Sequence, residues 1–322
     1  VVREYGPPES FRIEDLPTPE PGPGQARVAI QAAGLSFVDA LIAAGKYQVK
    51  PPPPFSPGTE FAGVVEALGP EVAGLSVGDR VIGGSLVGGL QQAIVVPART
   101  LTRAPDGMDS GEAAVFRMGY STAYHALVQR ARLEPGETVL VLGAAGAVGS
   151  ASVNLAKALG ARVIASASTP EKRELALAMG AEAAVDSRAE DWRDQIKALT
   201  GGKGVDVVVD PVGGAAMEPA FRSLAWNGRH LVIGFAAGEI ARLAANLPLL
   251  KGGALVGVDV RQFGEREPDL AADNMKRLFA LYAEGRIRPH IGLRLPLDRF
   301  AEALVKAGDG SAAGRVVVEP WA

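Results

Sequence analysis

Hydrophobic and polar positions follow different patterns in three parts of this chain. In residues 1–117, short apolar stretches occur at 25–33, 58–68, 79–82 and 92–96, separated by segments dense in proline and glycine. Short strands joined by such turns are typical of a partly closed β-barrel. We therefore expect a barrel here, interrupted by one short helix at 38–44.

From 118 to 261 the pattern changes to alternating strands and helices. Apolar stretches predict strands at 138–142, 162–165, 183–186, 205–210, 230–234 and 254–258. Apolar residues at helical spacing lie between most of them, for example at 169–179, 191–200 and 215–224. This alternation predicts an α/β fold, a Rossmann-type doubly wound parallel sheet that binds its ligand at the carboxyl ends of the strands.

The end of the chain, 262–322, mixes helices at 267–283 and 298–307 with short strands at 293–297 and 315–318. The simplest account is that these residues return to the first domain and complete it. We therefore expect a substrate domain made of 1–117 and 262–322 and a dinucleotide-binding domain at 118–261. An active-site cleft is expected between the two domains.

The segment 143–149, Gly-Ala-Ala-Gly-Ala-Val-Gly, follows an apolar strand and precedes a helix. Free N–H groups and the positive end of the helix dipole form a seat for a pyrophosphate there. Gly146 is expected to let the backbone approach the phosphates, and Gly149 to let helix and strand pack closely. Because Ala144 breaks a strict G-x-G-x-x-G motif, the prediction depends on the flanking strand and helix.

The second strand of this domain ends without an acidic residue. NAD sites carry a carboxylate there for the ribose 2′-hydroxyl, whereas this chain has Ser166 and Ser168, followed by Lys172 and Arg173. Hydroxyls and a cation suit a 2′-phosphate, which favours NADP(H). Alternatively, Ser168 or Thr169 caps the next helix and the two cations are solvated.

Composition excludes several classes of function. The 322 residues are 48% hydrophobic and 21% charged, as in a globular chain of about two domains. With a net charge of −3 we expect no nucleic-acid partner. The absence of cysteine excludes disulfides and thiolate zinc sites, and with three histidines we expect no metal. No apolar run or signal-peptide pattern indicates a membrane partner or export, so we expect a cytoplasmic protein, with a few residues of a first strand preceding Val1.

Motifs along nearly the whole chain resemble one family. In order they are 34–39 (GLSFVD), 45–47 (GKY), 57–65 (PGTEFAGVV), 77–81 (VGDRV), 121–124 (STAY), the glycine turn, 159–161 (LGA), 179–181 (MGA) and 206–212 (DVVVDPV). The chain resembles the zinc-independent quinone oxidoreductases of the medium-chain dehydrogenase/reductase superfamily, the group that includes ζ-crystallin. This resemblance implies a GroES-like β-barrel domain from both chain ends and a central Rossmann domain. It also implies NADPH-dependent reduction of quinones or related conjugated carbonyls by transfer from nicotinamide C4.

Zinc-dependent relatives in this superfamily have a cysteine near 36–39, a Gly-His-Glu where this chain has Gly58-Thr59-Glu60, and a four-cysteine loop. Here Thr59 replaces the histidine and every cysteine is absent. One carboxylate, Glu60, with Asp39 as a neighbour, does not make a zinc site. We expect both acids to be structural polar residues, with a catalytic role as the alternative.

The resemblance also implies the cofactor contacts. Thr122 is expected near the nicotinamide and Lys172 near the 2′-phosphate, while Arg315 either reaches the phosphate region or is an ordinary exposed strand residue. The full predicted set is Thr122, Ala144, Ala145, Gly146, Ala147, Val148, Gly149, Ser166, Ser168, Lys172, Val212, Ile233, Gly234, Phe235, Ala236 and Val258.

The acceptor slot has one candidate catalytic residue. Tyr47 resembles a tyrosine that acts as proton donor in related enoyl reductases, and alternatively it is a wall of the slot. Ser36 stands where the family commonly has an asparagine, and Arg117 suits a carboxylate or phosphate unless it is simply an interface residue. The remaining slot candidates are Phe37, Asp39, Tyr120 and Phe263.

Three functions remain open on this basis: a quinone reductase acting by one-electron or hydride transfer, an enone, alkenal or enoyl-thioester reductase, and an NADPH-binding protein with a structural or regulatory role. The apolar strand at 254–258 is the expected edge of the sheet. Since such an edge pairs readily with another chain, we expect a homodimer through it. The alternative is that the loop at 261–269 covers this edge.

Overall fold

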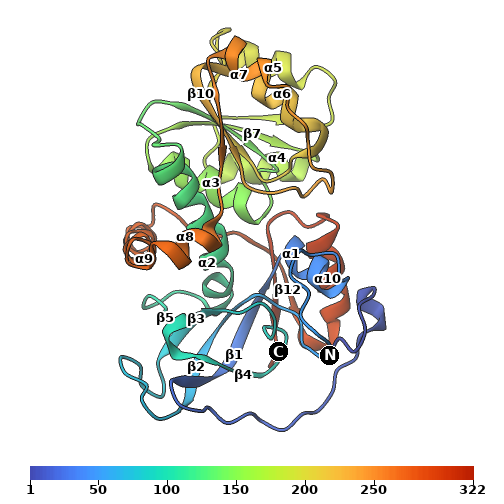
Figure 1. Ribbon diagram of the computed structural model, residues 1–322, viewed down its shortest axis with the longest axis vertical. Coiled ribbons are helices and arrows are strands. Elements are labelled where there is room, and N and C mark those ends of the chain that lie inside the picture. Colours follow the sequence, from blue (N-terminus) through green and yellow to red (C-terminus); the bar gives the residue numbers. More distant parts are fainter. The chain divides into compact units, whose positions relative to one another are not determined.

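The computed structural model describes all residues, Val1–Ala322, and they form two compact units (Figure 1). Unit 1 consists of Val1–Arg117 and Pro289–Ala322, and unit 2 of Met118–Arg288. The helix α2 (Ser110–Tyr124) begins in the first and ends in the second. No helix is both long and apolar enough to span a membrane.

Unit 1 is built on a seven-stranded sheet in the order β12-β13-β1-β2-β3-β5, with β4 also paired to β1. All pairings are antiparallel except that of β12 with β13. The strands are β1 (Gln25–Leu35), β2 (Glu60–Leu68), β3 (Arg80–Gly84), β4 (Ala93–Pro97), β5 (Thr102–Arg103), β12 (Ile291–Pro296) and β13 (Arg315–Glu319). The predicted strands of both chain ends are therefore present in one sheet.

Alternation along β1 builds the two cores of unit 1. Ala26, Val28 and Ile30 point into one core, where they pack with apolar residues of β2, β3 and β4. Leu35, at the other end of β1, joins a second core with α1 (Phe37–Ala43), α10 (Phe300–Gly308) and β13. Three short 3-10 helices complete the unit, at Pro8–Ser10, Ala98–Thr100 and Leu297–Arg299.

Unit 2 contains the predicted doubly wound sheet, six parallel strands in the order β11-β10-β9-β6-β7-β8. They are β6 (Thr138–Leu142), β7 (Arg162–Ala167), β8 (Ala183–Asp186), β9 (Val205–Asp210), β10 (Leu224–Val232) and β11 (Ala254–Gly257). Every residue of β6 is buried, as expected for a central strand. The strand order reverses between β6 and β9, and ligands of such sheets bind next to this switch point.

The helices of unit 2 lie mostly where the sequence predicts them. They are α3 (Ala147–Ala158), α4 (Pro170–Ala178), α5 (Trp192–Leu199), α6 (Met217–Arg222), α7 (Asn246–Lys251), α8 (Val260–Arg266) and α9 (Pro268–Ala283), with a π-helical segment at His125–Arg130 and a 3-10 turn at Gly214–Ala216. Strand β10 begins six residues earlier than expected, because Leu224 pairs with Val205 before the ladder shifts register.

One domain boundary differs from the expectation. Residues 262–288, predicted to join the first domain, belong to unit 2. The side-chain amides of Asn274 in α9 and Gln129 in the π-helical segment exchange hydrogen bonds of 2.9 and 3.3 Å. Phe263 stacks on His125 with ring centroids 4.0 Å apart. These contacts attach α8 and α9 to unit 2, and the chain returns to unit 1 only at Pro289.

Candidate functional site

The glycine turn between β6 and α3 presents backbone rather than side chains. Gly143 adopts a positive φ of 57°, and the Gly146 amide donates to its carbonyl at 2.9 Å. A Cβ at Gly149 would lie 2.1 Å from the Gly143 oxygen, which confirms that Gly149 allows close packing of helix on strand. Gly146 is the exposed N-cap of α3 and provides no side-chain cap. The first-turn amides of α3 are therefore left for a ligand or water.

The predicted cofactor residues around this turn come from neighbouring loops. A Cβ at Gly143 would lie 2.9 Å from Val212 Cγ2, so the turn and the loop after β9 are adjacent. Ala236 donates its amide to the Pro211 carbonyl at 3.2 Å, which joins the loop after β10 to the same edge. Val258, after β11, donates to the Val232 carbonyl at 3.0 Å. Ala144 and Ala145 are buried behind the turn.

Thr122 is placed by α2, which passes the start of α3. A Cβ at Gly119 would lie 2.8 Å from the Ala147 carbonyl, so these two helices are in close contact. Thr122 is buried one turn further along α2. This position is in unit 2, next to the first turn of α3.

The contacts at the end of β7 bear on two alternatives for its polar residues, a 2′-phosphate site or a helix cap with solvated cations. Thr169 caps α4 by accepting a hydrogen bond from the Lys172 amide at 3.4 Å, so the Ser168 hydroxyl is not the cap. Arg173, which was expected to be solvated, forms an ion pair of 3.0 Å with Asp186. Asp186 is paired in register with Ala167, at the end of β7. The Asp186 carboxylate at this strand end is thus already neutralised by Arg173.

A buried acid organises the start of α1 in unit 1. Asp39 accepts hydrogen bonds from the Ser36 amide at 2.7 Å, the Ser36 hydroxyl at 2.8 Å and the Thr59 amide at 2.7 Å. Burial raises the pKa of the Asp39 carboxyl, and these donors act in the opposite direction. Asp39 therefore ties the first turn of α1 to the residue that precedes β2.

A second buried acid in unit 1 corrects the expectation for Arg315. This arginine, which belongs to unit 1, is buried rather than exposed and forms a 2.7 Å ion pair with Glu60. Its other terminal nitrogen donates to the Val115 carbonyl at 3.2 Å. Asp39 and Glu60, the two acids considered above for a zinc site, are thus both engaged by protein groups.

The predicted slot residues divide between the two units. Ser36, Phe37, Asp39, Tyr47 and Arg117 belong to unit 1. Tyr47 is half-buried and packs against the core that contains Leu35. The Arg117 guanidinium donates to the Thr100 carbonyl at 3.0 Å, and burial lowers its pKa while nearby Glu60 raises it.

The other two slot candidates are packed inside unit 2. Tyr120 is almost completely buried and donates its hydroxyl to Asn154 at 2.8 Å. The same Asn154 oxygen accepts the Arg288 amide at 2.7 Å. Phe263 is buried against His125. Both aromatic side chains therefore contribute to the packing of unit 2, and their place in an acceptor slot stays a prediction.

Comparison with known proteins agrees with this arrangement. Residues 22–106 match the alcohol dehydrogenase GroES-like domain, and residues 147–277 match the zinc-binding dehydrogenase family. Quinone oxidoreductase-like protein 2 of Rattus norvegicus is 38% identical over 311 residues, which cover 96% of this chain and 89% of the relative. The chain belongs to the quinone oxidoreductase-like proteins. These are members of the medium-chain dehydrogenase/reductase superfamily, and the oxidoreductase class follows from this membership.

Solved structures place the whole chain in the same fold. Mycobacterial Rv1454c complexed with NADPH has a TM-score of 0.90 at 31% identity, covering 99% of this chain and 98% of that chain. CurK enoyl reductase has a TM-score of 0.88 at 26% identity, covering 99% and 97%. The predicted GroES-like and Rossmann combination is therefore confirmed. The matched proteins thus include both a quinone oxidoreductase-like protein and an enoyl reductase.

Two residues of this quinone oxidoreductase-like chain were not singled out from the sequence. Asp210, the last residue of β9, accepts the amides of Val212 at 2.9 Å and Gly213 at 2.7 Å. Its other oxygen lies 2.9 Å from Nε2 of His230 in β10. The available signal was their polarity: Asp210 ends the apolar run Val207–Val209, and His230 directly precedes the apolar residues 231–233.

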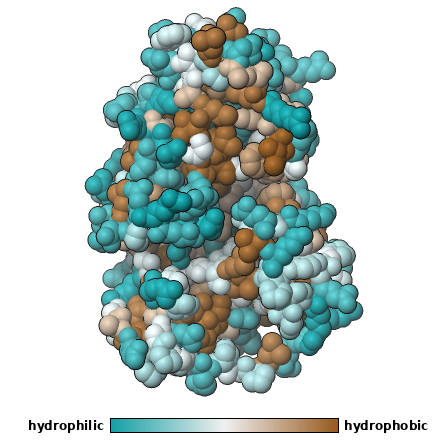
Figure 2. Space-filling model, viewed as in Figure 1, coloured by the Kyte–Doolittle hydropathy of each residue, from teal (hydrophilic) through white to brown (hydrophobic).

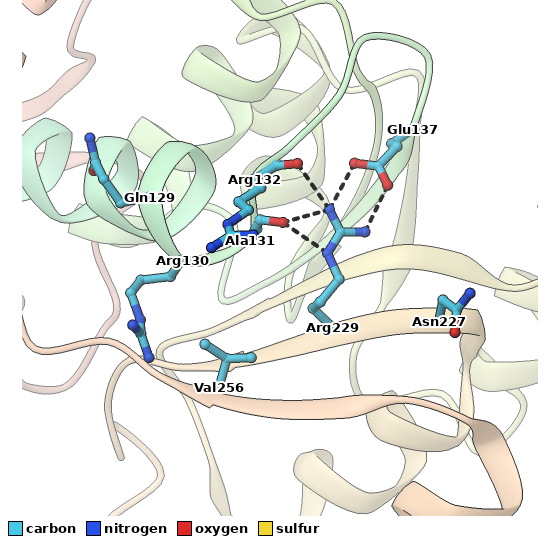
Figure 3. A pocket seen from close by; sticks show the side chains of 8 residues that line it. All are labelled: Gln129, Arg130, Ala131, Arg132, Glu137, Asn227, Arg229 and Val256. Carbon is cyan, nitrogen blue, oxygen red and sulfur yellow. Dashed lines mark hydrogen bonds and ion pairs between the residues drawn. The ribbon is translucent and has the colours of Figure 1, made fainter.

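A surface pocket of about 530 Å³ lies elsewhere on unit 2 of this quinone oxidoreductase-like chain (Figure 3). Glu137 precedes β6, and Arg229 pairs in register with the first residue of β11, so the pocket is at the amino ends of the strands. Arg229, at its centre, binds both Glu137 oxygens at 2.7 and 2.9 Å and the Ala131 carbonyl at 2.7 and 2.9 Å. The lining residues are Gln129, Arg130, Ala131, Arg132, Glu137, Asn227, Arg229 and Val256. The pocket is thus distinct from the glycine-turn edge.

Proposed function

We propose that this chain is an NADPH-dependent reductase of quinones or related conjugated carbonyls. The observation that carries the proposal is the glycine turn, where Gly149 lets α3 pack closely on the turn and Gly146 provides no side-chain cap, so the first-turn amides of α3 are uncapped. The NADPH-complexed mycobacterial structure supports the choice of cofactor. When bound, NADPH supplies a hydride from nicotinamide C4.

The residues around the turn fit this cofactor. The amides of Ala147, Val148 and Gly149 bind the pyrophosphate, which Gly146 allows to approach the backbone. Ser166, Ser168 and Lys172 bind the 2′-phosphate, and the engagement of Asp186 by Arg173 removes a repulsive carboxylate from that end of β7. The nicotinamide and its ribose are held by Thr122, Val212, Ile233, Gly234, Phe235, Ala236 and Val258, while Ala144 and Ala145 support the turn from behind.

Residues of unit 1 bind the acceptor in this proposal. Ser36 and Phe37 begin α1, whose first turn is fixed by Asp39. Arg117 supplies a cation, and Tyr47 either donates a proton to the acceptor oxygen or forms a wall of the slot. Reduction of a quinone by hydride places negative charge on that oxygen, which a hydrogen-bond donor stabilises. No metal has a role in this scheme.

A panel of acceptors tests the proposal. We expect NADPH oxidation with quinones and tighter binding of NADPH than of NADH, measured by cofactor absorbance and fluorescence. NADPH binding without turnover of any quinone, enone or enoyl thioester would support the structural or regulatory role instead. Equal affinity for the two cofactors would contradict the 2′-phosphate site. Unchanged turnover in Tyr47→Phe would leave Tyr47 as a wall only.

An enoyl-thioester reductase is the second candidate function. It is favoured by the similarity to CurK enoyl reductase and by the half-buried cation of Arg117. Such a reductase would turn over an enoyl thioester faster than a quinone. The same panel, compared by kcat/KM, decides between the two acceptors.

We propose in addition that the chain forms a homodimer through β11. This edge strand pairs with β10 alone, and Leu255 within it is 45% exposed. Trp226 and Leu249 nearby are 74% and 79% exposed, and hydrophobic side chains gather at the end of unit 2 where α7 lies (Figures 1 and 2). Residues 261–269 fold into α8 and the start of α9 and leave Leu255 uncovered. Sedimentation should show a dimer that Leu255→Lys dissociates; a monomeric wild-type chain would contradict this.

A further inference from the structure

We propose that His230 is a positioning residue for the nucleotide site, acting through Asp210 on the loop after β9. The inference rests on the proposed function, because it concerns the same cofactor edge. Neither His230 nor Asp210 is a predicted contact of the cofactor. Their role is to fix the backbone of residues 211–213.

The two side chains meet because of the register of the parallel strands. His230 is paired with Val208, and Asp210 lies two residues further along β9. Residues two apart in a strand project from the same face, so both side chains enter the core beside Phe221. Both are almost completely buried, and Nε2 of His230 lies 2.9 Å from Oδ2 of Asp210.

The other carboxylate oxygen of Asp210 controls the loop. Oδ1 accepts the amides of Val212 and Gly213 at 2.9 and 2.7 Å, which closes a tight turn after the strand. Gly213 has a φ of +66°, which glycine adopts without a steric penalty, so the chain can close this turn onto the carboxylate. Rotation of the carboxylate would break both bonds, and the Nε2 contact of His230 opposes this rotation.

The loop after β9 is in turn hydrogen-bonded to the loop after β10. The Pro211 and Val212 carbonyls accept the amides of Ala236 at 3.2 Å and Ala237 at 2.9 Å, in the loop after β10. A Cβ at Gly213 would lie 3.0 Å from the Phe235 ring. Val212 and 233–236 are proposed cofactor contacts, so one buried carboxylate supports two of the loops that bind the ribose and nicotinamide.

The two nitrogens of His230 make different contacts, and this difference provides a test. Nε2 contacts Asp210, whereas Nδ1 has no hydrogen-bond partner. The pair therefore needs a polar group at the Nε2 position only. Glutamine places its amide nitrogen there, whereas leucine keeps the bulk and removes the hydrogen bond.

The experiment compares His230→Leu, His230→Gln and a packing control, Val208→Ala, which removes apolar contacts from the same face of the sheet. We expect His230→Leu to weaken NADPH binding about tenfold and to leave the KM of the acceptor unchanged. His230→Gln should stay within about threefold of wild type, and Val208→Ala should lower the unfolding midpoint without changing NADPH affinity.

Hydrogen exchange provides a readout that does not depend on the cofactor. The Val212 and Gly213 amides should exchange faster in His230→Leu and as in wild type in His230→Gln. If His230→Leu does not fold, Asp210→Asn, which keeps the volume of the side chain, should show the same loss of protection. Equal protection in wild type, His230→Leu and Asp210→Asn would overturn the inference, as would equal weakening by leucine and glutamine. A wild-type chain that fails to bind NADPH would overturn the proposed function, while the exchange result would still decide the role of His230.

Discussion

The two ends of the parallel sheet in unit 2 are built in opposite ways. At the carboxyl ends, glycines bring backbone close to backbone and the first-turn amides of α3 are uncapped. At the amino ends, the guanidinium of Arg229 is fully engaged by Glu137 and by the carbonyls of Ala131, Arg132 and Asp206. The comparison teaches that a large surface pocket need not mark the function of unit 2, because the proposed binding end of the sheet is shaped by main chain.

The largest expected effect comes from placing a side chain in the glycine turn. Gly149→Val puts atoms about where the Gly143 carbonyl oxygen lies, 2.1 Å from the added Cβ, so the turn has to open. We expect NADPH affinity to fall more than about 100-fold and stability to fall by about 2–3 kcal/mol. Titration calorimetry and urea unfolding measure the two effects.

The matched control is Gly264→Ala in α8, where an added Cβ meets no atom within 4 Å. This variant should bind NADPH as wild type does and be slightly more stable, since alanine favours helix. If Gly149→Val binds NADPH normally, the backbone of the turn is not the phosphate seat.

At the amino ends, Arg229→Met should affect stability and not binding. It leaves the partly buried Glu137 and the Ala131 carbonyl without their donor, which costs about 2 kcal/mol. The control Arg222→Met removes an exposed ion pair with Glu218 and should cost less than about 0.5 kcal/mol. A large loss of NADPH affinity in Arg229→Met would contradict the proposal that only the carboxyl ends of the strands contribute to cofactor binding.

The Arg229 contribution should also depend on pH. Burial acts to raise the pKa of Glu137, but the hydrogen bonds from Arg229 and from the Glu134 amide, together with the positive charge of Arg229, outweigh it and lower the pKa below 4.5. A depressed folded-state pKa stabilises the protein above 4.5, and this stabilisation is lost as the pH falls through the folded-state value. The stability gap between wild type and Arg229→Met should therefore shrink in acid, as measured by urea midpoints; a gap that is constant to pH 3 would argue against the ion pair.

The smallest effect is expected at the end of β7. Lys172→Gln removes the cation proposed for the 2′-phosphate, so NADPH should bind about tenfold more weakly while NADH binding is unchanged. Arg173→Gln is a second variant at this site, and it tests the role of the Asp186 charge that Arg173 neutralises. Its loss should also weaken NADPH binding, by freeing a negative charge. Equal losses for NADH and NADPH would point to a general disturbance of the loop.

Local features of the fold were predictable, and distant pairings were not. The strands at 138–142, 183–186 and 205–210 and the glycine turn are encoded in contiguous residues, and the structure confirms them. The ion pair of Glu60 with Arg315 joins residues that are 255 positions apart. Neither local sequence indicates which residue will be its partner. A strand arginine looks exposed until its partner is known.

The same limit explains the misplaced boundary and the packing contacts of two slot candidates that the sequence did not reveal. The helix at 268–283 has a polar face, but its assignment to unit 2 depends on Asn274 meeting Gln129, 145 residues away. Tyr120 and Phe263 were read as slot residues because they are aromatic, yet a hydroxyl bond to Asn154 and a stack on His125 bury them. His230 was visible only as a polar residue directly before an apolar stretch.

The position of β13 has a consequence for biosynthesis. This last strand lies inside its sheet, between β12 and β1, and carries the partner of Glu60. Unit 1 therefore cannot finish folding until β13 has left the ribosome, whereas unit 2 is one continuous segment that is complete earlier. Protease challenge of nascent chains stalled so that residue 288 has just left the ribosome should find the second unit already resistant and the first still sensitive. The segment made first is thus the last to become protected.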